Sequence, residues 1–176
     1  MKKIALILTI ALLPLVGFSQ SVFDKFEDLE AVSTVVVNKK AFEMFSRLPA
    51  DDKDAKEFME LTKNLTGLKV FVTEDKAIGA DMKATVDKYL KSSSLEELMR
   101  AKDKEANVKF YIKQGRDADH VSELLMFITG LKNVEAEGRK VETVLLTLTG
   151  DIDLNKIGTL TEKMNLPSEL NKAKSN

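Results

Sequence analysis

Apolar residues recur along the chain with two spacings, one typical of strands and the other of helices. Alternating or continuous runs rich in β-branched and aliphatic residues predict five strands, at 32–38, 68–73, 108–113, 124–128 and 144–149. The run at 124–128 is apolar at every position, so we expect this strand to be central in a sheet. At 108–113 the apolar residues alternate with Lys109, Tyr111 and Lys113, which predicts one buried face and one wet face able to meet a partner.

Apolar residues spaced by three and four positions predict helices, at 21–29, 39–48, 54–66, 78–90, 94–97 and 154–166. The helices at 54–66 and 94–97 each begin with the spacing of a capping box. Val22, Phe26 and Leu29 share one face of the first helix, which either docks on the domain or stays mobile. Gly67 ends the predicted helix at 54–66, and Pro167 ends the one at 154–166.

The order of these elements is strand, two helices, strand, one or two helices, three strands and a final helix. This order predicts an α+β fold, a two-layer sandwich with a mixed sheet of about five strands and helices mainly on one face. The first two strands would form a right-handed crossover if parallel, and the last three should form an antiparallel meander. We expect a single domain at 31–166, preceded by a segment at 20–30 and followed by a polar tail at 167–176.

The first 19 residues have the layout of a secretory signal peptide. Two lysines precede an apolar run at 4–16, and small residues at Gly17 and Ser19 precede a cleavage point ahead of Gln20. The apolar run is shorter than the roughly 20 residues that cross a bilayer. We therefore expect cleavage between Ser19 and Gln20, location in the periplasm or outside the cell, and no integral membrane segment in the mature protein.

The chain of 176 residues contains no cysteine, which excludes disulfides, thiolate ligands, cysteine nucleophiles and the lipid anchor of bacterial lipoproteins. It has 27 basic and 28 acidic residues, with a formal net charge of −1. Nucleic-acid binding needs a clearly basic face, and an anionic membrane surface attracts clustered Lys and Arg. We therefore expect neither nucleic acid nor a membrane surface as a partner.

The most site-like cluster of polar residues comprises Asp117, Asp119, His120 and Glu123, because carboxylates and a histidine can hold a divalent cation. Residues 115–119 also have the composition of a hairpin turn, which is the interpretation we prefer. A Ser-His-Asp triad would have to use His120, the only histidine, but the chain has no Gly-x-Ser-x-Gly motif.

Asp151 and Asp153 lie at the predicted junction of the last strand and the last helix. Either could be half of an acid pair, but Asp153 is better explained as the N-cap of a helix that begins at Leu154. The same explanation applies to the acidic residues before an earlier helix, which are Asp51, Asp52 and Asp54. We therefore predict no catalytic, cofactor-binding or metal-binding residues, no cofactor, and no enzymatic activity.

Three segments resemble one protein family. They are VSTVVVNKKAFEMF at 32–45, ELLMF at 123–127 and LTLTGDIDL at 146–154. In this order and spacing they resemble the envelope proteins of Bacteroidota grouped as domain of unknown function family 4252, over roughly residues 21–166. The resemblance implies an envelope location but no catalytic residue, since the family is functionally uncharacterised. Some similar proteins carry a lipoprotein cysteine, which this chain lacks.

Three hypotheses of function follow. The first is an exported, non-catalytic binding or interaction protein of the bacterial cell envelope, whose partner is an unidentified envelope protein. The resemblance also implies an association with genes for extracytoplasmic-function sigma factors, and this favours the alternative of a component of an envelope-stress circuit. The third and least favoured hypothesis is a small metal-assisted hydrolase that uses Asp117, Asp119 and His120.

Overall fold

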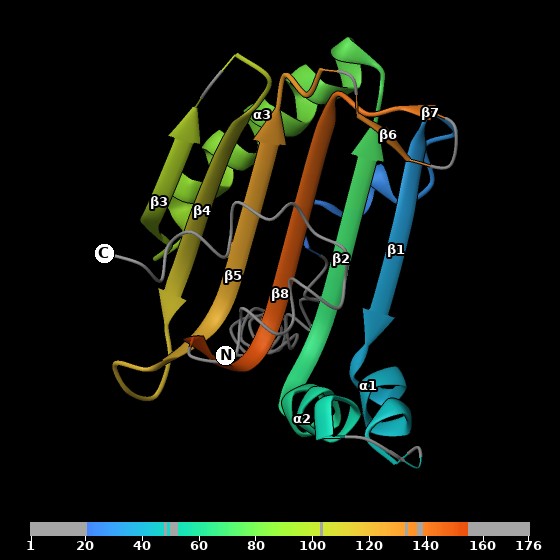
Figure 1. Ribbon diagram of the computed structural model, residues 1–176. Coiled ribbons are helices and arrows are strands. Elements are labelled where there is room, and N and C mark those ends of the chain that lie inside the picture. Colours follow the sequence, from blue (N-terminus) through green and yellow to red (C-terminus); the bar gives the residue numbers. More distant parts are fainter. Residues whose placement is uncertain are drawn as a thin grey trace, which may run out of the picture.

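The computed structural model describes residues 21–47, 49, 53–102, 104–132, 134–136 and 139–154. A six-stranded antiparallel sheet with few helices makes up most of this part of the chain, so the predicted mixture of helices and strands is confirmed (Figure 1). In chain order the elements are the 3-10 turn η2 (Asp24–Phe26), β1 (Val32–Asn38), α1 (Lys39–Phe45), α2 (Lys53–Thr62), β2 (Leu65–Thr73), α3 (Lys76–Ser92), β3 (Glu96–Lys102), β4 (Asn107–Gln114), β5 (His120–Thr129), β6 (Glu135–Ala136), β7 (Arg139–Lys140) and β8 (Thr143–Asp153).

The strands of the large sheet lie in the order β1-β2-β8-β5-β4-β3, and every neighbouring pair is antiparallel. β5 and β8 are central, as the apolar run at 124–128 predicted. β4, β5 and β8 form the predicted meander, with the small hairpin β6–β7 inserted between β5 and β8. The predicted mixed sheet was wrong, because every pair in the large sheet is antiparallel. β1 and β2 pair antiparallel with α1 and α2 in their connection, so the crossover expected for parallel strands does not arise.

The two faces of the sheet carry separate apolar clusters, because side chains of a strand alternate between its faces. On β8, Leu146 and Leu148 belong to the first cluster and Leu145 to the second. Met82 and Val86 of α3 complete the second cluster and are almost fully buried. Each large apolar side chain buried in this way contributes roughly 1.5–3 kcal/mol to the stability of the fold.

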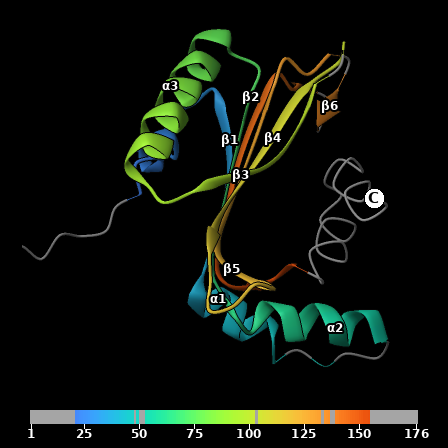
Figure 2. The same ribbon diagram turned by 90° about the vertical axis from the view of Figure 1, so that its left-hand side faces the viewer.

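Helices are not gathered on one face of the sheet as predicted. α3 and η2 cover the face of the second cluster, whereas α1 and α2 lie at one end of the sheet (Figure 2). Phe42 of α1 and Leu61 of α2 belong to the first cluster, on the opposite face from α3. The turn from β1 into α1 is fixed by a side-chain cap, since Asn38 Oδ1 accepts a hydrogen bond from the Ala41 amide at 3.0 Å.

The segment at 21–30 docks on the domain, but through only one of the three residues that its spacing placed on a shared face, Phe26, together with Phe23. Its only helical element is the single turn η2. Val22 and Leu29, which a helix would have placed on the same face as Phe26, are 49% and 39% exposed, whereas Phe23 and Phe26 are 1% and 0% exposed. A 3-10 turn has about three residues per turn, so residues three apart share a face, and this places Phe23 and Phe26 together against α3 and β2.

Charged side chains hold the same segment in place. The Lys69 amine on β2 forms an ion pair with Asp24 and lies 2.6 Å from Glu27 Oε1. Burial alone lowers the pKa of Lys69, but hydrogen bonds and charges from Asp24 and Glu27 outweigh it, and the pKa is raised overall. Lys25 adds an exposed ion pair with Asp81 of α3 at 2.7 Å, which contributes little because solvent screens it.

Several local predictions were wrong because tertiary pairing overrides local signals. Residues 96–102, preceded by a capping-box pattern, form β3 by pairing with β4 and not a helix. α2 ends at Thr62 and β2 begins at Leu65, so Gly67 lies inside a strand instead of closing a helix. Tyr111, predicted to be on a wet face, is only 8% exposed, because it belongs to the cluster under α3.

β8 continues through Asp153, where the sequence predicted a turn. The final helix predicted from Leu154 onward, the polar tail at 167–176 and the signal peptide at 1–19 lie outside the described residues apart from Leu154 itself.

Candidate functional site

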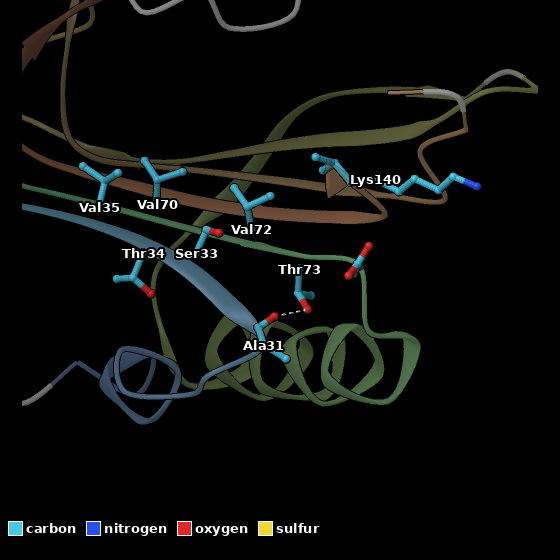
Figure 3. Close-up of a pocket in the computed structure, with 10 residues that line it drawn as sticks. Ala31, Ser33, Thr34, Val35, Val70, Val72, Thr73 and Lys140 are labelled. Atoms are coloured by element: carbon cyan, nitrogen blue, oxygen red, sulfur yellow. Dashed lines mark hydrogen bonds between the residues drawn. The ribbon is translucent and has the colours of Figure 1, made fainter. Parts of the chain in front are cut away.

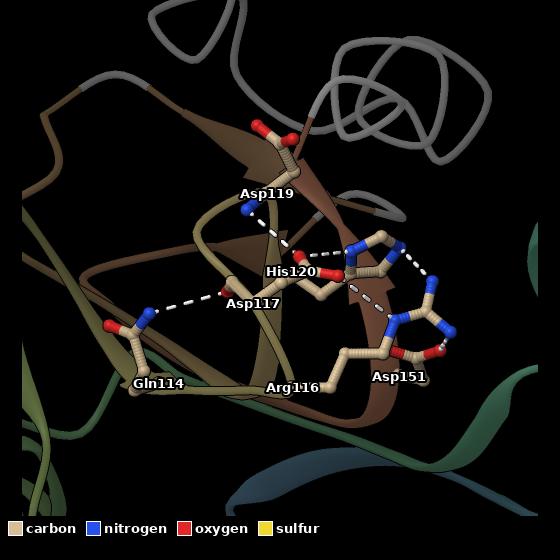
Figure 4. A network of polar contacts seen from close by, with 6 residues as sticks. All are labelled: Gln114, Arg116, Asp117, Asp119, His120 and Asp151. Carbon is tan, nitrogen blue, oxygen red and sulfur yellow. Dashed lines mark hydrogen bonds and ion pairs between the residues drawn. The ribbon is translucent and has the colours of Figure 1, made fainter.

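The acidic cluster singled out in the sequence lies in the β4–β5 hairpin loop (Figure 4). The side chain of Asp117 organises this loop: its Oδ1 accepts hydrogen bonds from the Asp119 amide at 3.0 Å and from His120 Nδ1 at 2.6 Å. The Gly115 amide closes the hairpin by donating to the His120 carbonyl at 3.0 Å. A carboxylate that bonds an amide two residues on is typical of a turn, so the loop has the geometry that the turn interpretation required.

Arg116 joins this loop to β8. Its guanidinium lies 3.3 Å from Asp117 Oδ2, 3.1 Å from Asp151 Oδ2 and 2.6 Å from His120 Nε2. A guanidinium can only donate, so we assign His120 the neutral tautomer that carries its proton on Nδ1 and donates it to Asp117. Both ring nitrogens of His120 are thereby engaged within the loop. The hydrogen bond from His120 is the main reason that the pKa of Asp117 is lowered.

Glu123 is not part of this cluster. Both of its carboxylate oxygens accept from the Tyr89 hydroxyl on α3, at 2.9 and 3.0 Å. Burial and this hydrogen bond raise the pKa of Tyr89 to about 12. Among the described residues, no group of three or more His, Cys, Asp or Glu side chains is placed to hold a metal ion. The structure therefore brings Asp117, Asp119 and His120 together but separates Glu123 from them.

The other acidic candidates that the structure describes lie near the end of β8 and at the start of α2. Asp151 lies in β8 and pairs with Arg116, and Asp153 lies opposite His120 in the β5–β8 register. The capping role predicted for Asp153 concerns a helix outside the described residues. Asp54 is the second residue of α2, while Asp51 and Asp52 fall outside the described ranges.

A surface that the sequence analysis missed lies at the free edge of β1. β1 and β3 are the two outer strands of the large sheet. β3 carries Glu96, Glu97, Arg100 and Lys102 and has a register irregularity between Glu97 and Met99, features that protect an edge from pairing with another chain. β1, with the sequence VSTVVVN, has no charge, no proline and an unbroken register with β2.

Large apolar side chains remain exposed on β1. Val35 is 53% and Val36 48% exposed, and the two point to opposite faces because they are consecutive in a strand. Beside Val35 lies a groove of about 400 Å³ on β1 and β2 (Figure 3). Val70 and Val72 form its apolar floor with Val35, and Glu74 and Lys140 also line it.

The strand character of 32–38 was readable from the sequence, but its place at an edge depends on which strands pair. The run of valines at 35–37 indicates a strand. It does not indicate an edge, because an internal strand would show the same composition.

Comparison with protein families gives one match. The model of the family described as Domain of unknown function (DUF4252) matches residues 26–160, which span the elements from Phe26 at the end of η2 through β8. The chain belongs to the DUF4252 family. The DUF4252 match confirms the resemblance seen in the three segments, whereas restriction to Bacteroidota and an envelope location stay predictions.

Comparisons with curated proteins and with solved structures gave no match. None of the helices in the described ranges combines the length and the apolar composition that crossing a membrane requires.

Proposed function

We propose that this DUF4252 chain is an exported, non-catalytic interaction protein of the bacterial cell envelope that binds an extended polypeptide segment of a partner along β1. The observation that carries the proposal is the contrast between the two sheet edges. A strand edge presents backbone N–H and C=O groups to any extended chain, and proteins usually block such edges with charges or bulges. β3 is blocked in this way and β1 is not.

Strand addition would use the backbone groups of β1 and its exposed valine side chains. Backbone hydrogen bonds along Val32–Asn38 would supply affinity without regard to sequence, and pockets for alternate side chains would supply specificity. The partner strand would cover Val35 on one face and Val36 on the other. Full burial of a valine side chain stabilises a complex by roughly 1.5–3 kcal/mol before the loss of motional freedom is subtracted.

The groove beside Val35 defines the chemistry of the partner. Its floor of three valines accepts an apolar side chain, and Glu74 and Lys140 can pair with polar groups flanking that side chain. Side chains of an added strand reach the groove at every second position. The preferred partner is therefore an extended segment with apolar residues at alternate positions.

Selection of short peptides from a displayed random library against the purified chain tests this proposal. Synthetic versions of the selected peptides are then titrated calorimetrically into the parent, Val35→Lys and Leu98→Lys. Leu98 is the matched control, because it is 49% exposed on the opposite edge strand. We expect Val35→Lys to weaken binding by at least about tenfold, or about 1.4 kcal/mol, and Leu98→Lys to leave it unchanged.

Two results would overturn the proposal. Peptides that bind the parent and Val35→Lys equally would place the site away from β1. Concentration-dependent dimerisation of the parent without peptide, abolished in Val35→Lys, would assign the edge to a second copy of the chain.

A further inference from the structure

A second cavity, of about 500 Å³, lies on the α3 face of the sheet, the face opposite the side chain of Val35, and reaches Val36, Val37 and Asn38 of β1. Its floor is formed by two adjacent rows of the sheet. Lys69 and Thr147 are direct partners in one row, and Gly67, Thr149 and Glu123 follow one another in the next. Phe23 and Tyr89 line it from the layer of η2 and α3. The size falls within the range of about 300–1,000 Å³ that small-molecule sites occupy.

Gly67 leaves space in the middle of this floor. A Cβ atom on Gly67 would lie 2.9 Å from Thr149 Oγ1, closer than real Cβ contacts allow. The Thr149 hydroxyl instead donates to the Gly67 carbonyl at 3.3 Å and lies 3.0 Å from the Thr66 hydroxyl. The absence of a side chain at this strand position therefore keeps the polar floor accessible.

The polar groups of the floor retain unused hydrogen-bonding capacity. Thr147 is only 7% exposed, and its hydroxyl has no hydrogen-bond partner among the described residues. The Glu123 carboxylate has about four lone-pair positions, and the single Tyr89 hydroxyl is its hydrogen-bond partner in the described part of the chain. A hydroxyl that lines the cavity and a carboxylate with free lone pairs favour an occupant that can both donate and accept.

The charges of the cavity exclude an anion. Lys69 is the basic residue that lines it, and its charge is already matched by Asp24 and Glu27. Glu123 then leaves an excess of negative charge, which repels phosphates and carboxylates. The ring of Tyr89 adds an apolar surface beside the polar floor and is held by the buried ring of Phe23, whose centroid is 5.2 Å away.

We infer that this cavity binds a neutral, hydroxyl-rich ligand of the size of a mono- or disaccharide. Sugar hydroxyls would donate to Glu123 and exchange hydrogen bonds with Thr147 and Thr149, while the C–H face of the sugar ring would pack on Tyr89. The inference does not depend on peptide binding in the groove at Val35, because Val35 points to the other face of the sheet and does not line this cavity. Val36, Val37 and Asn38 of β1 do line it, so a strand added along β1 would border the cavity.

Ligand-observed NMR with cellobiose, maltose and N,N′-diacetylchitobiose as probes tests the inference on the parent protein. Thr147→Val removes the hydroxyl without changing the shape of the side chain. Thr143→Val is the matched control, since Thr143 lies on the same strand, is also buried, and is outside the cavity. Val35→Lys separates this site from the β1 groove.

We expect at least one probe to bind the parent, to bind Thr147→Val at least about tenfold more weakly, and to bind Thr143→Val and Val35→Lys as it binds the parent. Absence of binding by all three sugars would overturn the inference, as would equal binding to Thr147→Val. Tighter binding of spermidine than of any sugar would also overturn it, because negative charge alone would then define the site.

Discussion

The hydroxyl of Tyr89 on α3 donates to both carboxylate oxygens of Glu123 on β5, at 2.9 and 3.0 Å. This contact ties the helix to the sheet and removes Glu123 from the acidic cluster suggested by the sequence. It also favours the neutral phenol, because burial and the nearby carboxylate both oppose its ionisation.

The ionisation of Tyr89 can be followed directly. The chain has two tyrosines, so Tyr111→Phe leaves Tyr89 as the only source of phenolate absorbance. We expect a titration midpoint near the pKa of about 12, and a lower midpoint when Glu123→Gln is added. A midpoint near 10, the ordinary value, in Tyr111→Phe alone would contradict the contact.

The same shift makes stability depend on pH. The pKa of Tyr89 is higher in the folded protein than in the unfolded chain. The neutral Tyr89 side chain therefore makes its full contribution to the free energy of unfolding below pH 10, and this contribution is lost as pH rises toward 12. We expect the free energy of unfolding of Tyr89→Phe to fall less steeply than that of the parent across this window. Urea unfolding at a series of pH values measures both slopes, and equal slopes would contradict the assignment.

Docking of the N-terminal segment predicts unequal effects for two neighbouring apolar residues. Phe26 is 0% exposed and lies 6.0 Å from Phe71 between ring centroids, whereas Leu29 is 39% exposed. Phe26→Ala should destabilise the fold by about 3–5 kcal/mol, and Leu29→Ala, the control, by about 0.5 kcal/mol or less. Chemical denaturation decides, and similar losses for the two variants would mean that this segment is not part of the core.

Two glycines with positive φ should respond differently to alanine. Gly150 has φ 138°, and a Cβ there would lie 2.3 Å from the Asn64 carbonyl oxygen, whereas Gly130 has φ 69° and open space around it. Both substitutions impose backbone strain of about 1 kcal/mol or more, and Gly150→Ala adds a clash with backbone. We expect a clearly larger loss of thermal stability for Gly150→Ala, and the reverse order would contradict the close approach of β8 to the start of β2.

Asp117 should titrate below its ordinary pKa of 3.8, mainly because of the hydrogen bond from His120. Its contribution to stability is present above that value and is lost as pH falls through the lower folded pKa. NMR titration of the Asp117 carboxyl should show a rise toward 3.8 in His120→Ala. An unchanged pKa in that variant would show that the loop contact is absent in solution.

Long elements with a regular apolar period were predictable from the sequence. Which other elements pair with them or pack on them was not. β1, β5 and α3 follow patterns that are carried by many residues in one segment. Tyr111 was misplaced because its burial depends on α3, whose Met82 and Val86 belong to the same cluster, and the pattern within β4 does not show what covers its second face. β3 was mistaken for a helix because a local capping pattern was weighed without the partner strand.

The candidate site shows the same limit. The turn role of Asp117 could be predicted, since its partners are its immediate neighbours. The free edge of β1 could not, because the sequence does not show which strands remain without a neighbour. The pairing of Glu123 with Tyr89, 34 positions away, is likewise a product of the fold.

Amide hydrogen exchange of the parent chain with a selected peptide tests the central claim most directly. If an extended segment adds to β1, exchange should slow within Val32–Asn38 and stay unchanged within Glu96–Lys102 on the opposite edge. The protection at β1 should disappear in Val35→Lys. Protection confined to β3, or peptide binding with no change at β1, would contradict the account.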